Sequence, residues 1–334
     1  MTRLGQLGVG YWGRNLLRNF VGLRECEVKW VCEPVQSAHK FIATTAPTAR
    51  ITAEDTEVFG DPDLDAVVIA TPAPTHAELA MQALSAGKHV FVEKPMALTV
   101  PDAERIVRTA AAAGKVLMVG HLLEYHPAFL RVKEMIEAGE LGEIYYLYST
   151  RVNLGRVRKD ENALWSLAPH DISIALMILG DEPVAATAIG RDYLQRGIED
   201  VAFLTIRFAK GQIAHCHVSW LDPHKVRQLT VVGSKKMVVL DDMEPSEKLR
   251  VYDKGVNWTG QYSSYGDALT LREGDIHIPH LEMVEPLRLE CQAFLDAARS
   301  GVPPRSDGRD GLNVVRVLAA ADRSLRENGA PVPV

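Results

Sequence analysis

Short apolar runs alternate with amphipathic stretches along residues 1–122. Residues 65–70 are almost continuously apolar, as expected of a strand that is buried on both faces of a parallel sheet. Further apolar runs lie at residues 28–32, 89–93 and 116–120, with helical patterns between them. Thr99 is placed to cap the helix that follows it. Strand and helix in regular succession predict a doubly wound parallel sheet, that is, an N-terminal Rossmann domain of the α/β class.

The pattern changes over residues 123–334 and predicts a second, α+β domain. Strand-like segments there are longer, and they lie at residues 144–152, 184–189, 201–208, 212–220 and 226–232. Helical patterns lie at residues 128–138, 170–179, 286–300 and 311–326. These segments predict an open, mostly antiparallel sheet, with a last helix that is free to pack back on the first domain. Residues 253–281 are polar and poorly periodic, which indicates a surface excursion.

One strand of the predicted open sheet is apolar on both sides. Val201 and Phe203 alternate with Ala202 and Leu204. A sheet that is apolar on both faces needs cover on both, so we expect a homodimer or homotetramer that packs through this sheet.

Composition narrows the class of protein. The chain has 334 residues, 47% hydrophobic and 24% charged, with a formal net charge of −6, so no general basic footprint for nucleic acid is present. No apolar run is long enough to cross a membrane, and the N-terminus shows no signal-like segment. The four cysteines form no C-x-x-C pair, which predicts free thiols, no metal site and a cytoplasmic location.

Gly8, Gly10 and Gly13 have the spacing of a dinucleotide-binding loop, with Tyr11 and Trp12 between the last two. The glycines allow a tight turn, close approach of the pyrophosphate and close packing of the next helix. Glu33 follows the second strand, where a carboxylate accepts hydrogen bonds from the adenosine ribose and repels a 2′-phosphate. Residues 34–37 contain no Arg or Lys. The pattern therefore favours NAD over NADP.

An ordered set of motifs resembles the glucose–fructose oxidoreductase/inositol dehydrogenase (Gfo/Idh/MocA) family. The set comprises the glycine loop, Ala70-Thr71-Pro72 with His76, Glu93-Lys94-Pro95, Tyr125-His126-Pro127-Ala128-Phe129, and His170-Asp171. It extends over nearly the whole chain. The resemblance implies an NAD-dependent oxidoreductase that acts on a sugar hydroxyl and forms oligomers through its second domain.

The resemblance also implies roles for individual residues. Thr71, Pro72, His76 and Glu93 would lie along the cofactor. Lys94 would lie between the nicotinamide and the substrate, and His170 of the second domain would meet it there. The family usually has an acidic residue where this chain has Ser166, which puts the usual contact of that carboxylate in doubt. Asp171 follows His170 and either contacts the substrate or stabilises the first turn of the helix.

Oxidation of an alcohol requires a base, because hydride leaves the carbinol carbon only as the hydroxyl loses its proton. Histidine titrates near neutrality, so we expect His170 to be the base and Lys94 to be its electrostatic partner. The reverse assignment stays open.

The substrate is less defined. Arg156 and Arg158 precede Trp165 and Ser166, and Arg227 follows a turn. Arginine side chains suit phosphate or carboxylate groups. These stretches resemble the branch of the family that includes the UDP-N-acetylglucosamine and UDP-N-acetylglucosaminuronate 3-dehydrogenases of surface-polysaccharide and lipid A precursor synthesis. Tyr125 is a further expected substrate contact. Dehydrogenation of inositol or another free polyol, and reduction of a 3-ketosugar, are the alternatives. A non-catalytic NAD-binding sensor is the alternative of another class.

Overall fold

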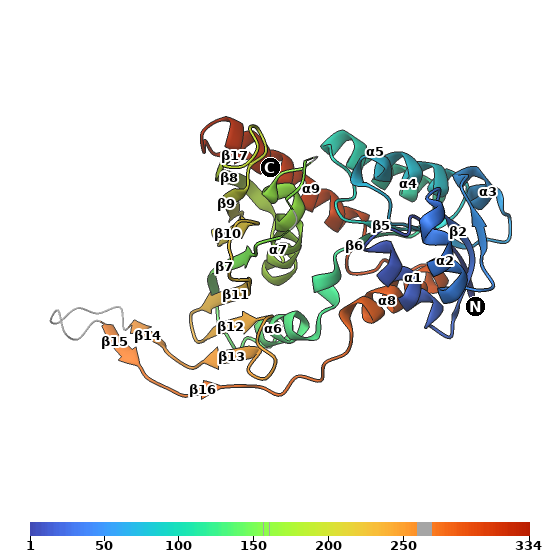
Figure 1. The fold of residues 1–334 in the computed structure, drawn as a ribbon. Helices are drawn as coiled ribbons and strands as arrows, with labels where there is room; N and C mark the ends of the chain where they lie inside the picture. The colour runs from blue at the N-terminus through green and yellow to red at the C-terminus, as the bar shows by residue number, and fades with distance from the viewer. Residues whose placement is uncertain (156, 160, 259–268) are drawn as a thin grey trace. The chain divides into compact units, whose positions relative to one another are not determined.

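The computed structural model describes residues 1–155, 157–159, 161–258 and 269–334 (Figure 1). The chain divides into two compact units. The first unit comprises Met1–His126 and Val284–Arg316, and the second comprises Pro127–Met283 and Val317–Val334. The C-terminal part of the chain thus contributes to both.

The first unit is built on a six-stranded sheet in the order β3-β2-β1-β4-β5-β6. All neighbouring strands of this sheet are parallel. The strands are β1 (Thr2–Leu7), β2 (Cys26–Cys32), β3 (Arg50–Thr52), β4 (Ala66–Ile69), β5 (His89–Glu93) and β6 (Leu117–Gly120). This strand order is that of a Rossmann fold, which binds dinucleotides at the carboxyl ends of its strands. The prediction of a doubly wound parallel sheet is confirmed.

Helices connect these strands as the alternation predicts. They are α1 (Gly13–Val21), α2 (Gln36–Thr45), α3 (Asp55–Gly60), η1 (Ala73–Thr75), α4 (His76–Ser85), α5 (Val100–Ala113) and η2 (Leu122–Tyr125). The Thr99 hydroxyl accepts a hydrogen bond from the backbone amide of Asp102, 3.2 Å away, so the predicted cap of α5 is confirmed. The sequence pattern did not indicate α2, β3 or α3. The elements β3 and α3 are short, with three and six residues, and α2 buries only Ala38 and Ile42.

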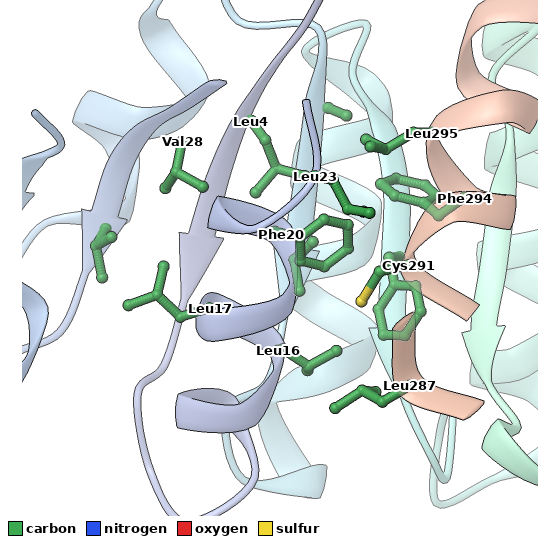
Figure 2. Packing of buried hydrophobic residues seen from close by; sticks show 14 of the residues in the cluster. Leu4, Leu16, Leu17, Phe20, Leu23, Val28, Leu287, Cys291, Phe294 and Leu295 are labelled. Atoms are coloured by element: carbon green, nitrogen blue, oxygen red, sulfur yellow. The ribbon is translucent and has the colours of Figure 1, made fainter. Parts of the chain in front are cut away.

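A cluster of aromatic rings forms the centre of the core of the first unit. Phe20 of α1, Phe91 of β5 and Phe294 of α8 (Pro286–Ser300) pack edge to face, with ring centroids 5.7–6.3 Å apart. Figure 2 shows α8 and α1 facing each other, with Leu16, Phe20 and Leu23 opposite Leu287 and Phe294. The C-terminal segment therefore completes the core of the N-terminal sheet.

The second unit contains a nine-stranded sheet in the order β16-β13-β12-β11-β7-β10-β9-β8-β17. Its strands are β7 (Ile144–Val152), β8 (Pro183–Arg191), β9 (Val201–Phe208), β10 (Ile213–Ser219), β11 (Val226–Gly233), β12 (Met237–Asp241), β13 (Leu249–Tyr252), β16 (Ile276–His277) and β17 (Val332–Pro333). The β7–β10 pair is parallel and the other described pairs are antiparallel. The predicted open, mostly antiparallel sheet is confirmed.

Helices cover one face of this sheet. The helix α7 (Ala163–Leu179) packs on β7, β9 and β10, and α6 (Pro127–Glu137) packs on α7 and β12. Ala202, Leu204 and Ile206 of β9 are buried on this side, whereas Phe203 on the other side is 43% exposed. The last helix, α9 (Gly308–Arg326), is divided between the two units.

The surface excursion predicted at residues 253–281 includes a two-stranded sheet of its own. It consists of β14 (Gly255–Trp258) and β15 (Leu269–Arg272), which pair with each other and not with the nine-stranded sheet (Figure 1).

Candidate active site

The glycine loop after β1 has the backbone that its spacing predicts. Gly8 adopts a φ of +87°, and a Cβ atom there would lie 2.6 Å from the carbonyl oxygen of Ala70. A Cβ atom on Gly13 would overlap the carbonyl oxygen of Gly8, so α1 begins in direct contact with the loop. A Cβ atom on Gly10 would meet no protein atom within 4 Å. The fold therefore requires glycine at positions 8 and 13, whereas position 10 is left open for a ligand.

Gln6 holds this loop in place, and the sequence pattern did not single it out. Its buried side-chain amide donates hydrogen bonds to the carbonyl oxygens of Gly8, at 3.0 Å, and Gly13, at 2.7 Å. A glutamine within the short apolar run at residues 4–7 was the available signal, because an amide that is buried there requires partners.

A cavity of about 480 Å³ opens at the carboxyl ends of β1, β2 and β4. Gly8, Gly10, Glu33, Thr71 and Pro72 all line it, as the sequence predicts for a dinucleotide site, and Glu54 and Asp55 are additional lining residues.

The Glu33 carboxylate at the edge of this cavity accepts hydrogen bonds from the backbone amides of Val9, at 2.7 Å, and Val35, at 3.0 Å. It therefore fixes the glycine loop as well as lining the cavity. The open Gly10 position, the loop amides at the start of α1 and the carboxylate beside the ribose position together fit a dinucleotide.

His76, the first residue of α4, joins two loops of this edge of the sheet. One ring nitrogen lies 2.8 Å from the carbonyl oxygen of Pro95, and the other lies 2.8 Å from that of Thr71. Burial is the main cause that lowers the pKa of this ring, and the charge of Lys94 adds to it. His76 therefore braces the turn after Lys94 against the turn that lines the cavity.

Lys94 follows β5 and precedes Pro95 through a cis peptide bond. The carboxylate of Glu93 accepts a hydrogen bond from the Lys94 amide at 3.2 Å and another from the Trp12 side chain. Glu93 thereby ties the lysine to the glycine loop. Because Glu93 is buried, its pKa is raised to about 7, while these two donors and the charge of Lys94 oppose that rise.

Several buried titratable groups of the first unit surround this point. Burial, reinforced by the charge of Glu93, raises the pKa of Glu290 on α8 well above its ordinary value. Burial, with a smaller contribution from Lys94, lowers the pKa of His121 to about 3, so this ring is neutral at pH 7. Lys94 itself is partly exposed, and its charge contributes to the pKa shifts of the buried Glu93 and His121.

Tyr125 lies in the interior of the first unit. Its hydroxyl is 3.1 Å from the Ser306 hydroxyl, and its ring is 7% exposed. Because the Tyr125 hydroxyl is bonded to Ser306 inside the first unit, Tyr125 is not among the proposed substrate contacts.

In the second unit, α7 contains the candidate residues Trp165, Ser166, His170 and Asp171. The Asn162 side chain caps the helix by accepting a hydrogen bond from the Trp165 amide at 3.0 Å. Ser166 and His170 are four residues apart and so share one helix face, and both are partly exposed. Asp171 is buried, on the side of the helix that packs on the sheet.

Asp171, Arg158 and Arg227, which were predicted to contact the substrate, each lie near an oppositely charged side chain of the second unit. Asp171 forms an ion pair with Arg151 of β7, a residue that the sequence pattern did not single out. Arg227 lies 3.9 Å from the Asp242 carboxylate, and Arg158 lies 3.3 Å from that of Glu161. Arg156 lies outside the described residues. Asp171 is thus ion-paired with β7 from the middle of α7, which begins at Ala163, so its predicted place in the first turn of the helix is wrong.

No helix among the described residues is long and apolar enough to cross a membrane.

The parallel sheet in the order 3-2-1-4-5-6, with its glycine loop and the cavity beside it, defines the first unit as a dinucleotide-binding domain of the Rossmann type. The family model for the oxidoreductase family with an NAD-binding Rossmann fold matches residues 2–121, and the model for the GFO/IDH/MocA C-terminal domain matches residues 129–239. The chain belongs to the Gfo/Idh/MocA family, and its cofactor is NAD.

Named relatives are similar to this chain over most of its length. The scyllo-inositol 2-dehydrogenase (NAD(+)) of Bacillus subtilis is 28% identical, over 98% of this chain and 94% of its own. The 1,5-anhydro-D-fructose reductase of Ensifer adhaerens is 33% identical, over 82% and 83%. The solved structure of a UDP-N-acetylglucosamine 3-dehydrogenase from Acidithiobacillus ferrooxidans has a TM-score of 0.81 at 24% identity, covers 97% of this chain and 98% of its own, and shows the same fold. The chain is accordingly an oxidoreductase that acts on sugars or polyols.

We expect NAD to bind at least about tenfold more tightly than NADP. The 2′-phosphate of NADP carries a charge of roughly −2 and would enter a cavity lined by the carboxylates of Glu33, Glu54 and Asp55. Dissociation constants from the quenching of protein fluorescence would measure the ratio. The double variant Glu54→Gln/Asp55→Asn should narrow this ratio, whereas Glu57→Gln, an exposed residue of α3 that does not line the cavity, should leave it unchanged. An unchanged ratio in the double variant would contradict the electrostatic explanation.

Proposed function

We propose that this protein uses NAD to oxidise a secondary hydroxyl on the ring of a sugar, with Lys94 and His170 as its catalytic residues. The observation that supports this most directly is the position of Lys94, since Glu93 binds both the Lys94 amide and the Trp12 side chain of the glycine loop. Because these contacts hold the backbone of Lys94 beside the glycine loop, its ammonium group is suited to bind the oxygen of the substrate.

The chemistry assigns one task to each residue. His170 removes the hydroxyl proton, and Lys94 stabilises the negative charge that develops on the oxygen. NAD, when bound, accepts the hydride from the same carbon. The reverse assignment, with Lys94 as base and His170 as relay, uses the same atoms and yields the same ketone. Ser166, on the helix face of His170, is proposed to hydrogen-bond the substrate, with Trp165 beside it.

The remaining proposed residues hold the cofactor. The amides of Gly10, Tyr11, Trp12 and Gly13, at the start of α1, would bind the pyrophosphate, and Glu33 would accept hydrogen bonds from the ribose. Gly8, Thr71, Pro72 and His76 would shape the cavity around it.

We propose a UDP-N-acetylhexosamine, or its uronate, oxidised at C3, as the substrate. The proposal is supported by the exposed arginine side chains of the second unit. Arg158 and Arg227 are 44% and 40% exposed, and a guanidinium group suits a phosphate or carboxylate. Arg156 is a further candidate for this contact. Free inositol is the second candidate, favoured by the name of the B. subtilis relative. Reduction of a keto sugar is the same reaction in reverse.

The test is incubation of the purified protein with NAD and, separately, UDP-N-acetylglucosamine, its uronate and myo-inositol. Each reaction is run with and without 2-oxoglutarate as a second oxidant, and both NADH and the keto product are measured by absorbance and mass. Turnover of a UDP-sugar alone supports the proposal, and turnover of inositol alone overturns the nucleotide-sugar assignment. Retained NAD binding with no turnover of these or of keto sugars would indicate a sensor module.

We further propose that the open face of the nine-stranded sheet joins copies of this chain into a dimer or tetramer. Tyr146, Tyr148, Phe203 and Ile213 are 42–44% exposed on this face, and the Phe203 ring stacks on His217 with a centroid distance of 4.4 Å. Sedimentation should give more than one copy, and Phe203→Lys should reduce that number. A monomeric wild-type protein would contradict the proposal. The four free cysteines support a reducing, cytoplasmic location.

A further inference from the structure

We propose that the buried ion pair between Arg151 and Asp171 positions His170, so that both residues act in catalysis without touching the substrate. The inference rests on the proposed role of His170. It assigns a function to Arg151, and it replaces substrate binding by Asp171 with a contact inside the second unit.

The geometry of the pair is that of a two-point clamp. The Arg151 Nε atom donates to Asp171 Oδ2 at 2.7 Å, and Nη2 donates to Oδ1 at 3.3 Å. The side chains are 9% and 6% exposed. Two parallel hydrogen bonds fix the orientation of the carboxylate as well as its distance, which a single bond to lysine would not do.

His170 depends on such a restraint because of its place in α7. Pro169 precedes it inside the helix and lacks the amide hydrogen that would bond to the preceding turn. The helix therefore lacks one backbone hydrogen bond immediately before His170. Arg151 extends from the middle of the sheet, since β7 pairs with both β10 and β11, and it holds the residue that follows His170. The Ser173 hydroxyl also donates to the His170 carbonyl oxygen, at 3.1 Å.

The clamp belongs to a small charged network on the covered face of the sheet. Arg227 of β11 lies directly opposite Arg151 in the strand register and lines the same small cavity as Asp171 and Asp242. Lys248 lies 3.2 Å from the Asp242 carboxylate. Removal of Asp171 alone would take the carboxylate away from the buried Arg151 guanidinium, which lies opposite a second guanidinium, that of Arg227, so a single substitution is expected to destabilise the protein.

The test separates position from stability through a double substitution. Asp171→Asn and Arg151→Met should each lower both Tm and kcat. The double variant Arg151→Met/Asp171→Leu removes both charges, so its Tm should return towards that of the wild type. Its kcat should stay at least about tenfold below wild type, with KM within about threefold, because a small displacement of a catalytic group is costly. Recovery of kcat together with Tm would overturn the proposal.

A more conservative single variant tests the proposal if the double variant does not fold. Arg151→Lys keeps the charge but loses the two-point contact, so kcat should fall with little change in Tm. Unchanged kcat in this variant would also overturn the proposal. The matched control is Arg3→Lys, since Arg3 forms a two-point pair with Asp65 in the first unit, at 3.2 and 3.1 Å. This control should keep the wild-type kcat.

A readout without substrate separates this proposal from the proposed function. The Cε1–H resonance of His170, assigned through His170→Gln in protein with ¹³C-labelled histidine and NAD, reports the surroundings of the ring. Arg151→Lys should shift or broaden it, and Arg3→Lys should not. If the wild type oxidises no sugar and the resonance still responds, the clamp stands and only the proposed function fails. A resonance that is the same in both variants would refute the clamp.

Discussion

Replacement of His170 with glutamine should lower kcat by about 100- to 10,000-fold, which is the usual contribution of a positioned acid or base. Glutamine keeps a polar side chain of similar reach but cannot take up the hydroxyl proton. Binding of NAD should be unchanged, because the candidate cofactor residues belong to the first unit. Initial rates over a range of pH, together with NAD titration, would measure both quantities.

The pH profile gives this prediction its specificity. If His170 is the base, the fall of the wild-type rate at acid pH should be absent from the residual activity of the variant. The matched control is His224→Gln, an exposed histidine between β10 and β11. If the variant loses less than about threefold in kcat and keeps the acid limb, His170 is not the base. Lys94 would then be the candidate base, and Lys94→Met would be tested in the same way.

The second large effect is a contrast between two glycines. Gly13→Ala should destabilise the chain by about 1–3 kcal/mol, because the new methyl group would overlap the carbonyl oxygen of Gly8 within a packed turn. Gly10→Ala should leave the free energy of unfolding within about 0.5 kcal/mol of wild type, because its Cβ atom meets no protein atom within 4 Å.

Binding of NAD should be affected by Gly10→Ala, the variant that leaves the stability unchanged. If the open space at Gly10 is where the pyrophosphate approaches the backbone, Gly10→Ala should weaken NAD binding by about tenfold or more, which corresponds to about 1.4 kcal/mol. Denaturant unfolding and fluorescence titration of the folded variants would measure the two effects. Normal NAD affinity in Gly10→Ala would place the pyrophosphate elsewhere.

The sequence predicted most of the first unit because its signals are local. The apolar run that became β4, the glycine spacing and the Thr99 cap each depend on neighbouring residues only. Residues 286–300 were also predicted as a helix, but their role in closing the core beside Phe20 depends on contacts between residues far apart in the chain. Such contacts leave no periodic pattern in either segment.

The candidate site shows the same division. Gly8, Gly10, Glu33 and Thr71 were predicted and lie around one cavity. The commitments of Tyr125 to Ser306 and of Asp171 to Arg151 were not predictable, because each is set by a partner that only the tertiary fold brings near. A polar residue within a functional motif can therefore contact either a ligand or another side chain in the protein interior, and the motif alone does not distinguish the two.

The aromatic contact of Phe20 and Phe91 with Phe294 has a consequence for the order in which the protein is made. A ribosome releases the N-terminal sheet long before it reaches α8, so the early chain emerges with its apolar α1 surface uncovered. The second unit, apart from its last residues, leaves the ribosome before the first unit can close. During synthesis the first unit is thus expected to complete its folding after most of the second unit. A fragment that ends at residue 126 should aggregate unless a chaperone binds it.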